Sequence, residues 1–328
     1  MTKKKRILSG MRPTGPLHLG NLHGALANWI TMQNEYDCFF FIADWHALTS
    51  DYENTDSIGK NIDNMMIDWL SAGLSPDLCT MFVQSQVKEH SELFLLLSMI
   101  TPVPWLERNP TYKDQIVQMG NKDLSTFGFL GYPVLQTADI ILYKGDSVPV
   151  GVDQVPHIEI AREIVRRFNY LFDDVFPEPE AILTESPKIL GTDRRKMSKS
   201  YNNAIYLSDT PDEVMAKVSK MITDPQRGRK SDPGDPDICN VFEFHKLYSN
   251  SGTVEQLSKE CRTAEIGCVE CKKIMGKSLL KFLEPIHGKR KDYESRPDFI
   301  ADIVAAGCSK AREIAQQTME EVRAAVKI

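Results

Sequence analysis

The chain has 328 residues, of which 42% are hydrophobic and 26% charged, and its formal net charge is −6. The length predicts two domains of about 100–200 residues each, and the composition is that of an ordinary globular protein. No apolar stretch approaches the roughly 20 residues that cross a bilayer, and the basic start leads into Ser9 and Gly10 rather than into a secretory signal, so we expect a cytoplasmic protein.

The first 200 residues alternate between strand-like and helix-like segments. The run from Cys38 to Ala43 is apolar throughout, which is typical of a strand buried on both faces. The segment 58–70 repeats apolar residues at helical spacing and is followed by Gly73, a common helix stop. Strands that alternate with helices predict a parallel sheet, with strands expected at 6–9, 38–43, 80–84 and 147–150 and helices at 21–32, 58–70 and 154–168.

From Pro211 onward the predicted segments are all helical, separated by loops at 232–237 and 287–297. The last helix, 309–326, has its apolar residues on one face. We therefore place a boundary near residue 200, between an α/β domain over residues 1–200 and an all-α domain over residues 201–328.

The first expected strand ends in a loop that suits an anionic ligand. Gly15 and Gly20 lack a Cβ, so a nucleotide could approach the main chain closely, and His18 and Asn21 supply neutral donors. The loop leads into a helix N-terminus, which favours anions. Neither the Walker spacing nor the G-x-G-x-x-G spacing is present, and a His-x-Gly-Asn tetrapeptide on its own occurs by chance.

A second loop motif, Lys196-Met197-Ser198-Lys199-Ser200, lies where the α/β pattern gives way to helices. Two lysines and two small hydroxyl side chains suit a leaving pyrophosphate, because lysine is a compact charge with three donors. The alternative is an exposed basic loop without a function. The presence of both motifs in this order makes that alternative the weaker one, and we expect the loop to open and close during turnover.

With Pro13-Thr14-Gly15 and His18-Leu19-Gly20-Asn21 ahead of Lys196 to Ser200, the chain resembles the class I aminoacyl-tRNA synthetases. The segments 43–49, 131–139 and 149–157 extend this to a resemblance with bacterial tryptophanyl-tRNA synthetases along nearly all of the first 200 residues. The resemblance implies a Rossmann-like catalytic domain for ATP and tryptophan at 1–200. It also implies an α-helical domain at 201–328 that binds the tRNA anticodon, with a last helix that can pack back on the catalytic domain.

The resemblance further implies a set of site residues, carried over position by position. Those with a catalytic role would be His18, Asn21, Lys196 and Lys199. Those around ATP would be Arg12, Pro13, Thr14, Gly20, Asn21, Gly151, Val152, Asp153, Ile189, Lys196, Met197, Ser198, Lys199 and Ser200. Those around tryptophan would be Leu8, His46, Gln136, Asp139, Val148, Val150 and Gln154. Bacterial relatives often carry Glu where Val152 stands, so only a main-chain role is expected for Val152.

The implied reaction activates tryptophan with ATP and transfers it to the 3′ end of tRNA(Trp), with Mg²⁺ accompanying ATP and a homodimer as the working form. Asp139 would accept the indole N–H, since an ionised carboxylate only accepts and indole only donates. A tyrosine hydroxyl could donate to the same carboxylate, so a tyrosine–tRNA ligase is the alternative enzyme. A synthetase-like binding protein without catalysis is a further alternative, which the two intact motifs argue against.

Four of the seven cysteines lie in the second domain with 21, 6 and 2 residues between them, namely Cys239, Cys261, Cys268 and Cys271. Thiols stay reduced in the cytoplasm, so this grouping suggests a metal site. The uneven spacing favours a [4Fe–4S] cluster, which some tryptophanyl-tRNA synthetases carry with a similar spacing. Zn²⁺ and four unconnected cysteines are the alternatives. The basic run 272–291 follows directly, and it either faces tRNA phosphates or is a solvated helix face.

Overall fold

The structure is a computed structural model that describes residues 4–118, 124–184 and 189–328. Its α/β region holds a five-stranded parallel sheet in the order β3-β2-β1-β4-β5, as the alternating pattern predicts. The sequence pattern does not predict β5, because this edge strand is short and only partly buried. The strands are β1 (Arg6–Met11), β2 (Asp37–Ile42), β3 (Cys79–Val83), β4 (Ser147–Val150) and β5 (Glu180–Leu183).

The pairing of the central strand β1 opens a crevice on one side of it. β1 pairs with β2 along its whole length, from Arg6 to Met11. It pairs with β4 only where Ile7 lies opposite Ser147, so these two strands separate toward their carboxyl ends. The chain order runs outward in both directions from this point, and ligands of open parallel sheets bind at such a switch of strand order.

Successive residues of β1 and β2 face two hydrophobic cores, one on each side of the sheet. Ile7 and Phe40 contribute to the core that also contains Trp29, whereas Leu8 and Phe39 contribute to the opposite core. The helices of the α/β region are α1 (Leu19–Asn21), α2 (Ala27–Met32), α3 (Asp44–Asp51), α4 (Ile58–Ala72), α5 (Glu89–Ile100), α6 (Val103–Glu107), α7 (Pro110–Gln118), α8 (Phe127–Leu142) and α9 (Val155–Leu171).

The helix predicted at 21–32 is present but irregular. Between α1 and α2 lies a π-helical turn, Leu22–Leu26, in which Gly24 departs from helical geometry with φ −85° and ψ −107°. Such turns occur frequently at functional sites. The helix predicted at 58–70 ends as expected, because Gly73 caps α4 with a φ of 126° that other residues rarely adopt.

After residue 200 the structure is helical, as predicted, but one predicted loop is wrong. The segment 287–297 is helical as far as Glu294, and the next helix starts at Pro297, well before the predicted start at 309. Proline is tolerated in the first turn of a helix, so Pro297 marks a helix start, and the polar residues before it form a solvent face rather than a loop. The helices are α10 (Pro211–Ser219), α11 (Asn240–Tyr248), α12 (Ser251–Arg262), α13 (Cys268–Glu294) and α14 (Pro297–Val326).

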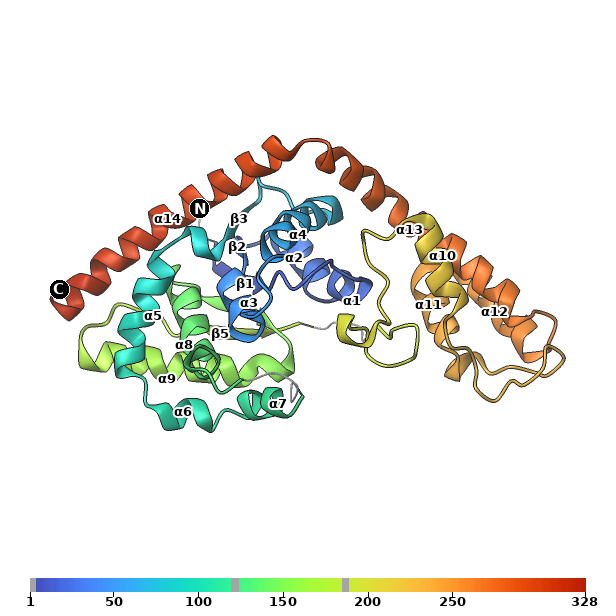
Figure 1. Ribbon diagram of the computed structural model, residues 1–328, viewed down its shortest axis with the longest axis horizontal. Coiled ribbons are helices and arrows are strands. Elements are labelled where there is room, and N and C mark those ends of the chain that lie inside the picture. Colours follow the sequence, from blue (N-terminus) through green and yellow to red (C-terminus); the bar gives the residue numbers. More distant parts are fainter. Residues whose placement is uncertain (1–3, 119–123, 185–188) are drawn as a thin grey trace.

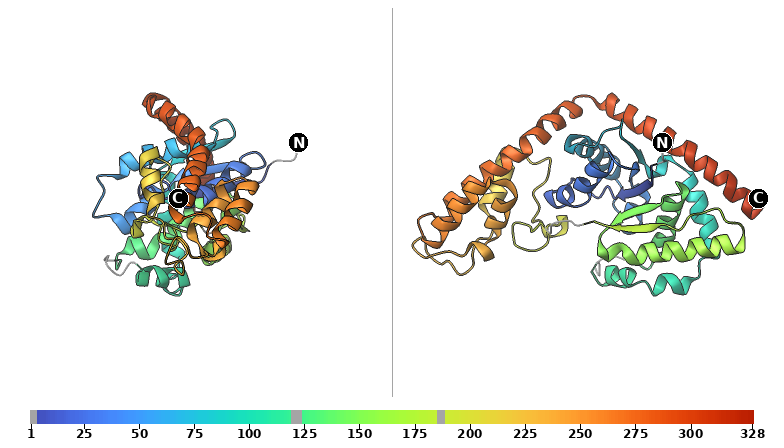
Figure 2. Two further views of the ribbon diagram at one scale, coloured as in Figure 1. Left: turned by 90° about the vertical axis from the view of Figure 1, so that its right-hand side faces the viewer. Right: turned by 180° about the vertical axis from the view of Figure 1, so that it is seen from behind.

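The last two helices tie the two halves of the molecule together. Figure 1 shows α13 and α14 along one side of the molecule, with α14 returning across the α/β region, and Figure 2 shows the same arrangement from behind. α14 contacts the edge strand β3 and also α5, α8 and α4. Among the described helices, none is both long and apolar enough to cross a membrane.

The contact between α14 and β3 depends on a glycine. Gly307 packs directly on the main chain of Met81, and a Cβ at this position would lie 1.8 Å from the Met81 carbonyl oxygen. That oxygen belongs to the backbone and cannot swing aside, so any side chain would push α14 off the strand. Cys308 and Ala311, which follow on α14, are fully buried against the sheet.

We predict that Gly307→Ala lowers the free energy of unfolding by about 1–3 kcal/mol, the usual cost of overpacking a well-packed core. The matched control is Gly288→Ala at an exposed position in the last two turns of α13, where a Cβ would meet nothing within 4 Å. That change should instead stabilise the protein by up to about 1 kcal/mol, because alanine is the better helix former. Urea denaturation of both variants measures the difference, and equal shifts of the same sign would contradict the proposed contact.

Candidate active site

A cavity of about 350 Å³ lies where β1 and β4 separate. Its walls come from β1, from β4, from the residues after β2 and from the inner face of α8. All seven residues predicted to surround the amino acid line this cavity, namely Leu8, His46, Gln136, Asp139, Val148, Val150 and Gln154. Arg12 and Gly151, from the set predicted for ATP, line it too.

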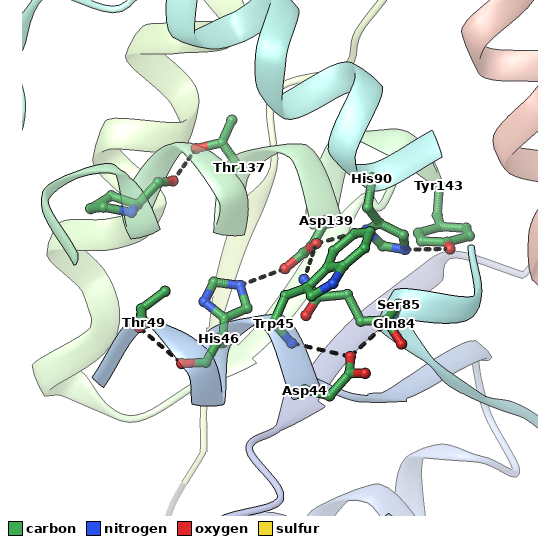
Figure 3. A network of polar contacts seen from close by, with 11 residues as sticks. Asp44, Trp45, His46, Thr49, Gln84, Ser85, His90, Thr137, Asp139 and Tyr143 are labelled. Carbon is green, nitrogen blue, oxygen red and sulfur yellow. Dashed lines mark hydrogen bonds and ion pairs between the residues drawn. The ribbon is translucent and has the colours of Figure 1, made fainter. Parts of the chain in front are cut away.

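Asp139 on α8 is the polar centre of the cavity wall, and Figure 3 shows it between two histidines. His46 on α3 donates from Nε2 to one carboxylate oxygen at 2.7 Å. His90 on α5 donates from Nδ1 to the other oxygen at 2.7 Å, and Gln84, which follows β3, donates to that same oxygen at 2.8 Å. The hydroxyl of Tyr143 lies 2.8 Å from the remaining ring nitrogen of His90.

These donors keep a fully buried carboxylate ionised. Burial alone would raise the pKa of Asp139, but the hydrogen bonds and charges of His46 and His90 lower it to about 2. A carboxylate has about four acceptor positions, and donors from the residues that the structure describes occupy three of them. One position is therefore left for a donor that enters the cavity.

Sequence reasoning missed several residues of this network. Gln84 and His90 lie in no recognised motif, and only the fold brings them to Asp139. Tyr132 also lines the cavity, and its hydroxyl lies 2.6 Å from Nε2 of His157, which is 2% exposed. Burial raises the pKa of Tyr132 and, together with the charge of His46, lowers the pKa of His157 to about 4, so both groups are neutral near pH 7.

The first loop motif is ordered by its own side chains. His18 is the N-cap of α1: its Nδ1 accepts from the main-chain N–H of Asn21 at 3.2 Å, while the Asn21 side chain accepts from the N–H of His18 at 3.0 Å. Burial and the charge of Lys199 lower the pKa of His18 to about 4. The ring is therefore neutral with its proton on Nε2, which makes it a donor.

The second loop motif lies against the first. Lys199 donates from Nζ to the carbonyl oxygen of Gly15 at 2.9 Å, and Met197 is buried beside Gly20. Burial lowers the pKa of Lys199 to about 8, against the opposing charge of Asp68. An ammonium held in this way still carries its charge at neutral pH and lies within reach of any phosphate bound on the loop.

The remaining residues predicted for ATP are not all in one place. Val152 is 75% exposed, which agrees with a main-chain role alone, and Asp153 accepts from its neighbour Gln154 at 2.9 Å. Ile189 lines a second cavity of about 350 Å³ between the segment 189–194 and α11. The others lie outside the lining of the first cavity, namely Pro13, Thr14, Gly20, Asn21, Asp153, Lys196, Met197, Ser198, Lys199 and Ser200.

The four cysteines of the helical region come from three helices. Cys239 precedes α11, Cys261 ends α12, and Cys268 and Cys271 begin α13. The guanidinium of Arg227 lies 4.0 Å from the sulfur of Cys261 and 3.8 Å from that of Cys268. Burial and the neighbouring thiols raise the pKa of Cys271 to about 12.

A single metal ion does not fit these cysteines as they stand. Across residues 4–118, 124–184 and 189–328, no three His, Cys, Asp or Glu side chains are grouped so that they could hold an ion. A [4Fe–4S] cluster makes a different demand, because each thiolate binds a different iron and the sulfurs stand farther apart. The four thiols lie at the ends of three helices, with the Arg227 guanidinium beside two of them.

Comparisons with known proteins agree on one family. A family model described as "tRNA synthetases class I (W and Y)" matches residues 1–284. The tryptophan–tRNA ligases of Thermotoga maritima and Aquifex aeolicus are 51% and 48% identical, and each alignment covers 98% of this chain and 99% and 100% of those proteins. A crystal structure of tryptophanyl-tRNA synthetase from Campylobacter jejuni, complexed with ADP and tryptophan, superposes with a TM-score of 0.91 at 32% identity over 98% of this chain and 100% of that one. The fold is accordingly a Rossmann-like sheet domain followed by a helical domain.

We predict that His157 makes stability depend on pH between about 6.5 and 4. Its pKa is lowered from 6.5 to about 4 in the folded protein, so the unfolded chain takes up a proton first. The contribution is complete above pH 6.5 and is lost as the pH falls through 4, up to about 3 kcal/mol at about 1.4 kcal/mol per pKa unit. Urea midpoints of the wild type and of His157→Gln, measured from pH 7 to 4, should converge, and a constant difference would contradict the prediction.

Proposed function

This chain belongs to the class I tRNA synthetases for tryptophan and tyrosine, and we propose that it is a tryptophan–tRNA ligase. In the first step the carboxylate of tryptophan attacks the α-phosphorus of ATP, forming a carboxyl–phosphate bond while the bond to pyrophosphate breaks. In the second step a ribose hydroxyl at the 3′ end of tRNA attacks the activated carbonyl, and AMP leaves with the bonding electrons. The proposal is supported by the full-length similarity to tryptophan–tRNA ligases and by the cavity at the switch point with Asp139 in its wall.

We propose that the indole N–H donates to this free position of Asp139. The ring would lie between Leu8, Val148 and Val150, whose apolar side chains share the cavity wall. The α-ammonium of tryptophan needs acceptors, and the oxygens of Tyr132 and Gln154 lie in the same wall. Tyr132 can donate its hydroxyl hydrogen to Nε2 of His157 in a hydrogen bond. The lone pairs of its oxygen can then accept from such an ammonium.

The ATP site is proposed on the two loop motifs. Gly20 and the main chain of 12–15 would lie under the phosphates, with the Nε2–H of His18 as a neutral donor and Asn21 beside it. Gly151, Val152 and Asp153 would hold the ribose, and Ile189 and Met197 would meet the adenine. Lys196 and Lys199, with Ser198 and Ser200, would meet the charge that develops on pyrophosphate, which is electrostatic stabilisation of the transition state. Mg²⁺ would accompany ATP.

The partners are proposed from the surface. Lys273, Lys277 and Lys281 are exposed at intervals of four residues along α13 and would face tRNA(Trp) phosphates. Arg290, which the sequence places in the same basic run, is buried and cannot contribute. Leu95 and Met99 are exposed apolar side chains one helical turn apart on α5, and they favour a homodimer through this helix. We propose that the reaction takes place in the cytoplasm, as expected from the sequence.

We also propose that Cys239, Cys261, Cys268 and Cys271 hold a [4Fe–4S] cluster. The support is the uneven spacing of the four cysteines in the sequence and their position at the ends of three helices, with the cation of Arg227 near two of the sulfurs. When bound, the cluster would supply cross-linking of three helices, so that ligation stabilises the fold of this region.

Pyrophosphate exchange into ATP tests the proposed function. Tryptophan should support exchange and tyrosine should not. Asp139→Ala should lower kcat/KM for tryptophan roughly a hundredfold, because a buried N–H loses a charged acceptor. This corresponds to a loss of about 3 kcal/mol of transition-state stabilisation. The KM for ATP is the internal control and should change little. Exchange driven by tyrosine would replace the proposal by the tyrosine enzyme, and no exchange with either amino acid would favour a binding protein.

Metal analysis of anaerobically purified protein tests the cluster. We expect about four irons per chain with visible absorption, and we expect Cys268→Ser to lose the iron. The matched control is Cys308→Ala, a buried cysteine on α14 that should leave the iron content unchanged. Stoichiometric zinc without iron would replace the cluster by a zinc site, and absence of any metal would reject both.

A further inference from the structure

A buried ion pair joins the helical region to the α/β region. Arg290, near the end of α13, donates from Nη1 to Oδ1 of Asp68 on α4. The side chains are 8% and 1% exposed. Arg290 is also held by Asn64 on α4 at 3.1 Å and by Glu294 on its own helix at 3.0 Å. The guanidinium is therefore fixed from both sides of the interface.

The second oxygen of Asp68 holds the first loop motif. Oδ2 accepts from the main-chain N–H of Leu17 at 3.3 Å, and Leu17 immediately precedes His18. The carbonyl oxygen of Leu17 accepts in turn from Leu207 at 2.9 Å, and the N–H of Leu19 donates to Ile205 at 3.0 Å. The start of the first motif is thus hydrogen-bonded to Asp68 on one side and to the segment 205–207, which follows the second motif, on the other.

Asp68 also faces the second loop motif. Burial raises the pKa of Asp68 to about 6, and the charges of Arg290 and Lys199 oppose this rise. The charge of Asp68 likewise opposes the lowering of the Lys199 pKa. Lys199 itself donates to the carbonyl oxygen of Gly15, which lies two residues before Leu17 in the same loop. One carboxylate thus lies among Arg290, the first motif and the lysine of the second.

Domain docking alone does not require these charges. Removing two ions from water costs several kcal/mol each, and replacing a buried ion pair by apolar side chains of similar size is often neutral or stabilising. An apolar pair could therefore join α4 and α13 equally well. It could not accept the N–H of Leu17, and it could not attract the ammonium of Lys199. A carboxylate at this position therefore serves the two loop motifs, since it accepts from Leu17 and attracts Lys199.

We propose that Asp68 is a positioning residue for the two loop motifs, and that Arg290 holds it in place, so that docking of the helical region is coupled to adenylate formation. This inference rests on the proposed function. α13 has 27 residues and is about 40 Å long at 1.5 Å per residue. It connects the cysteines at its start with Arg290 near its end, and through Arg290 with Asp68.

The test is the double variant Asp68→Leu/Arg290→Met, which replaces the pair by apolar side chains. Its urea midpoint should stay near that of the wild type, whereas the single-turnover rate of tryptophanyl-adenylate formation should fall about tenfold or more, as expected for losing a hydrogen bond to a charged group. The KM for tryptophan should not change, since Asp68 does not line the tryptophan cavity. Asp68→Asn, which keeps an oxygen for Leu17, should recover part of the rate.

The matched control is Glu92→Gln/Arg323→Met, which removes the ion pair between α5 and α14. This pair touches neither motif, so the rate of adenylate formation should equal that of the wild type. If the double variant of Asp68 and Arg290 keeps the wild-type rate, or if its rate falls only in proportion to its stability, the inference is overturned. If the wild type itself forms no tryptophanyl-adenylate, the proposed function fails instead.

Discussion

In a parallel sheet whose strand order reverses at its centre, the two strands at the switch leave an open crevice at their carboxyl ends. β1 and β4 share a single pairing at Ile7 and Ser147 and then separate, so side chains from both strands and from α8 point into the same space. The cavity is thus a consequence of topology before it is a consequence of any particular residue.

Two buried carboxylates illustrate how the molecule uses charge inside this frame. Asp139 is kept ionised by two histidines and Gln84, and it presents one free acceptor position to the cavity. Both carboxylate oxygens of Asp68 accept hydrogen bonds from other parts of the chain, one from Arg290 and one from the main chain of Leu17. A buried charge is costly unless its partners are complete, so each carboxylate fixes the geometry of the groups around it.

The sequence was informative where one local pattern dictates one structure. The apolar run around Phe39 and Phe40 predicted a strand buried on both faces, which β2 is, and the seven residues predicted for tryptophan do line one cavity. Local patterns do not reveal partners from distant segments, which is why Gln84 and His90 were missed. The loop predicted at 287–297 was wrong because its many charged residues suggested irregular chain. In the structure the segment is helical as far as Glu294, and Arg290 pairs with Asp68 across the interface. The roles of the ATP residues stay predictions.

The position of α14 on β3 has a consequence for how the protein is made. Every residue of β3 is buried in the finished structure, yet the strand is synthesised long before the helix that lies against it. Gln86, just after β3, and Arg312, which binds its carbonyl oxygen from α14, are 226 positions apart. At about 5–20 residues per second the ribosome needs roughly 10 to 45 seconds to cover that distance. Throughout this interval an apolar edge strand lacks its cover, and such edges template aggregation. The packing around this edge strand is therefore completed only when α14 has been synthesised.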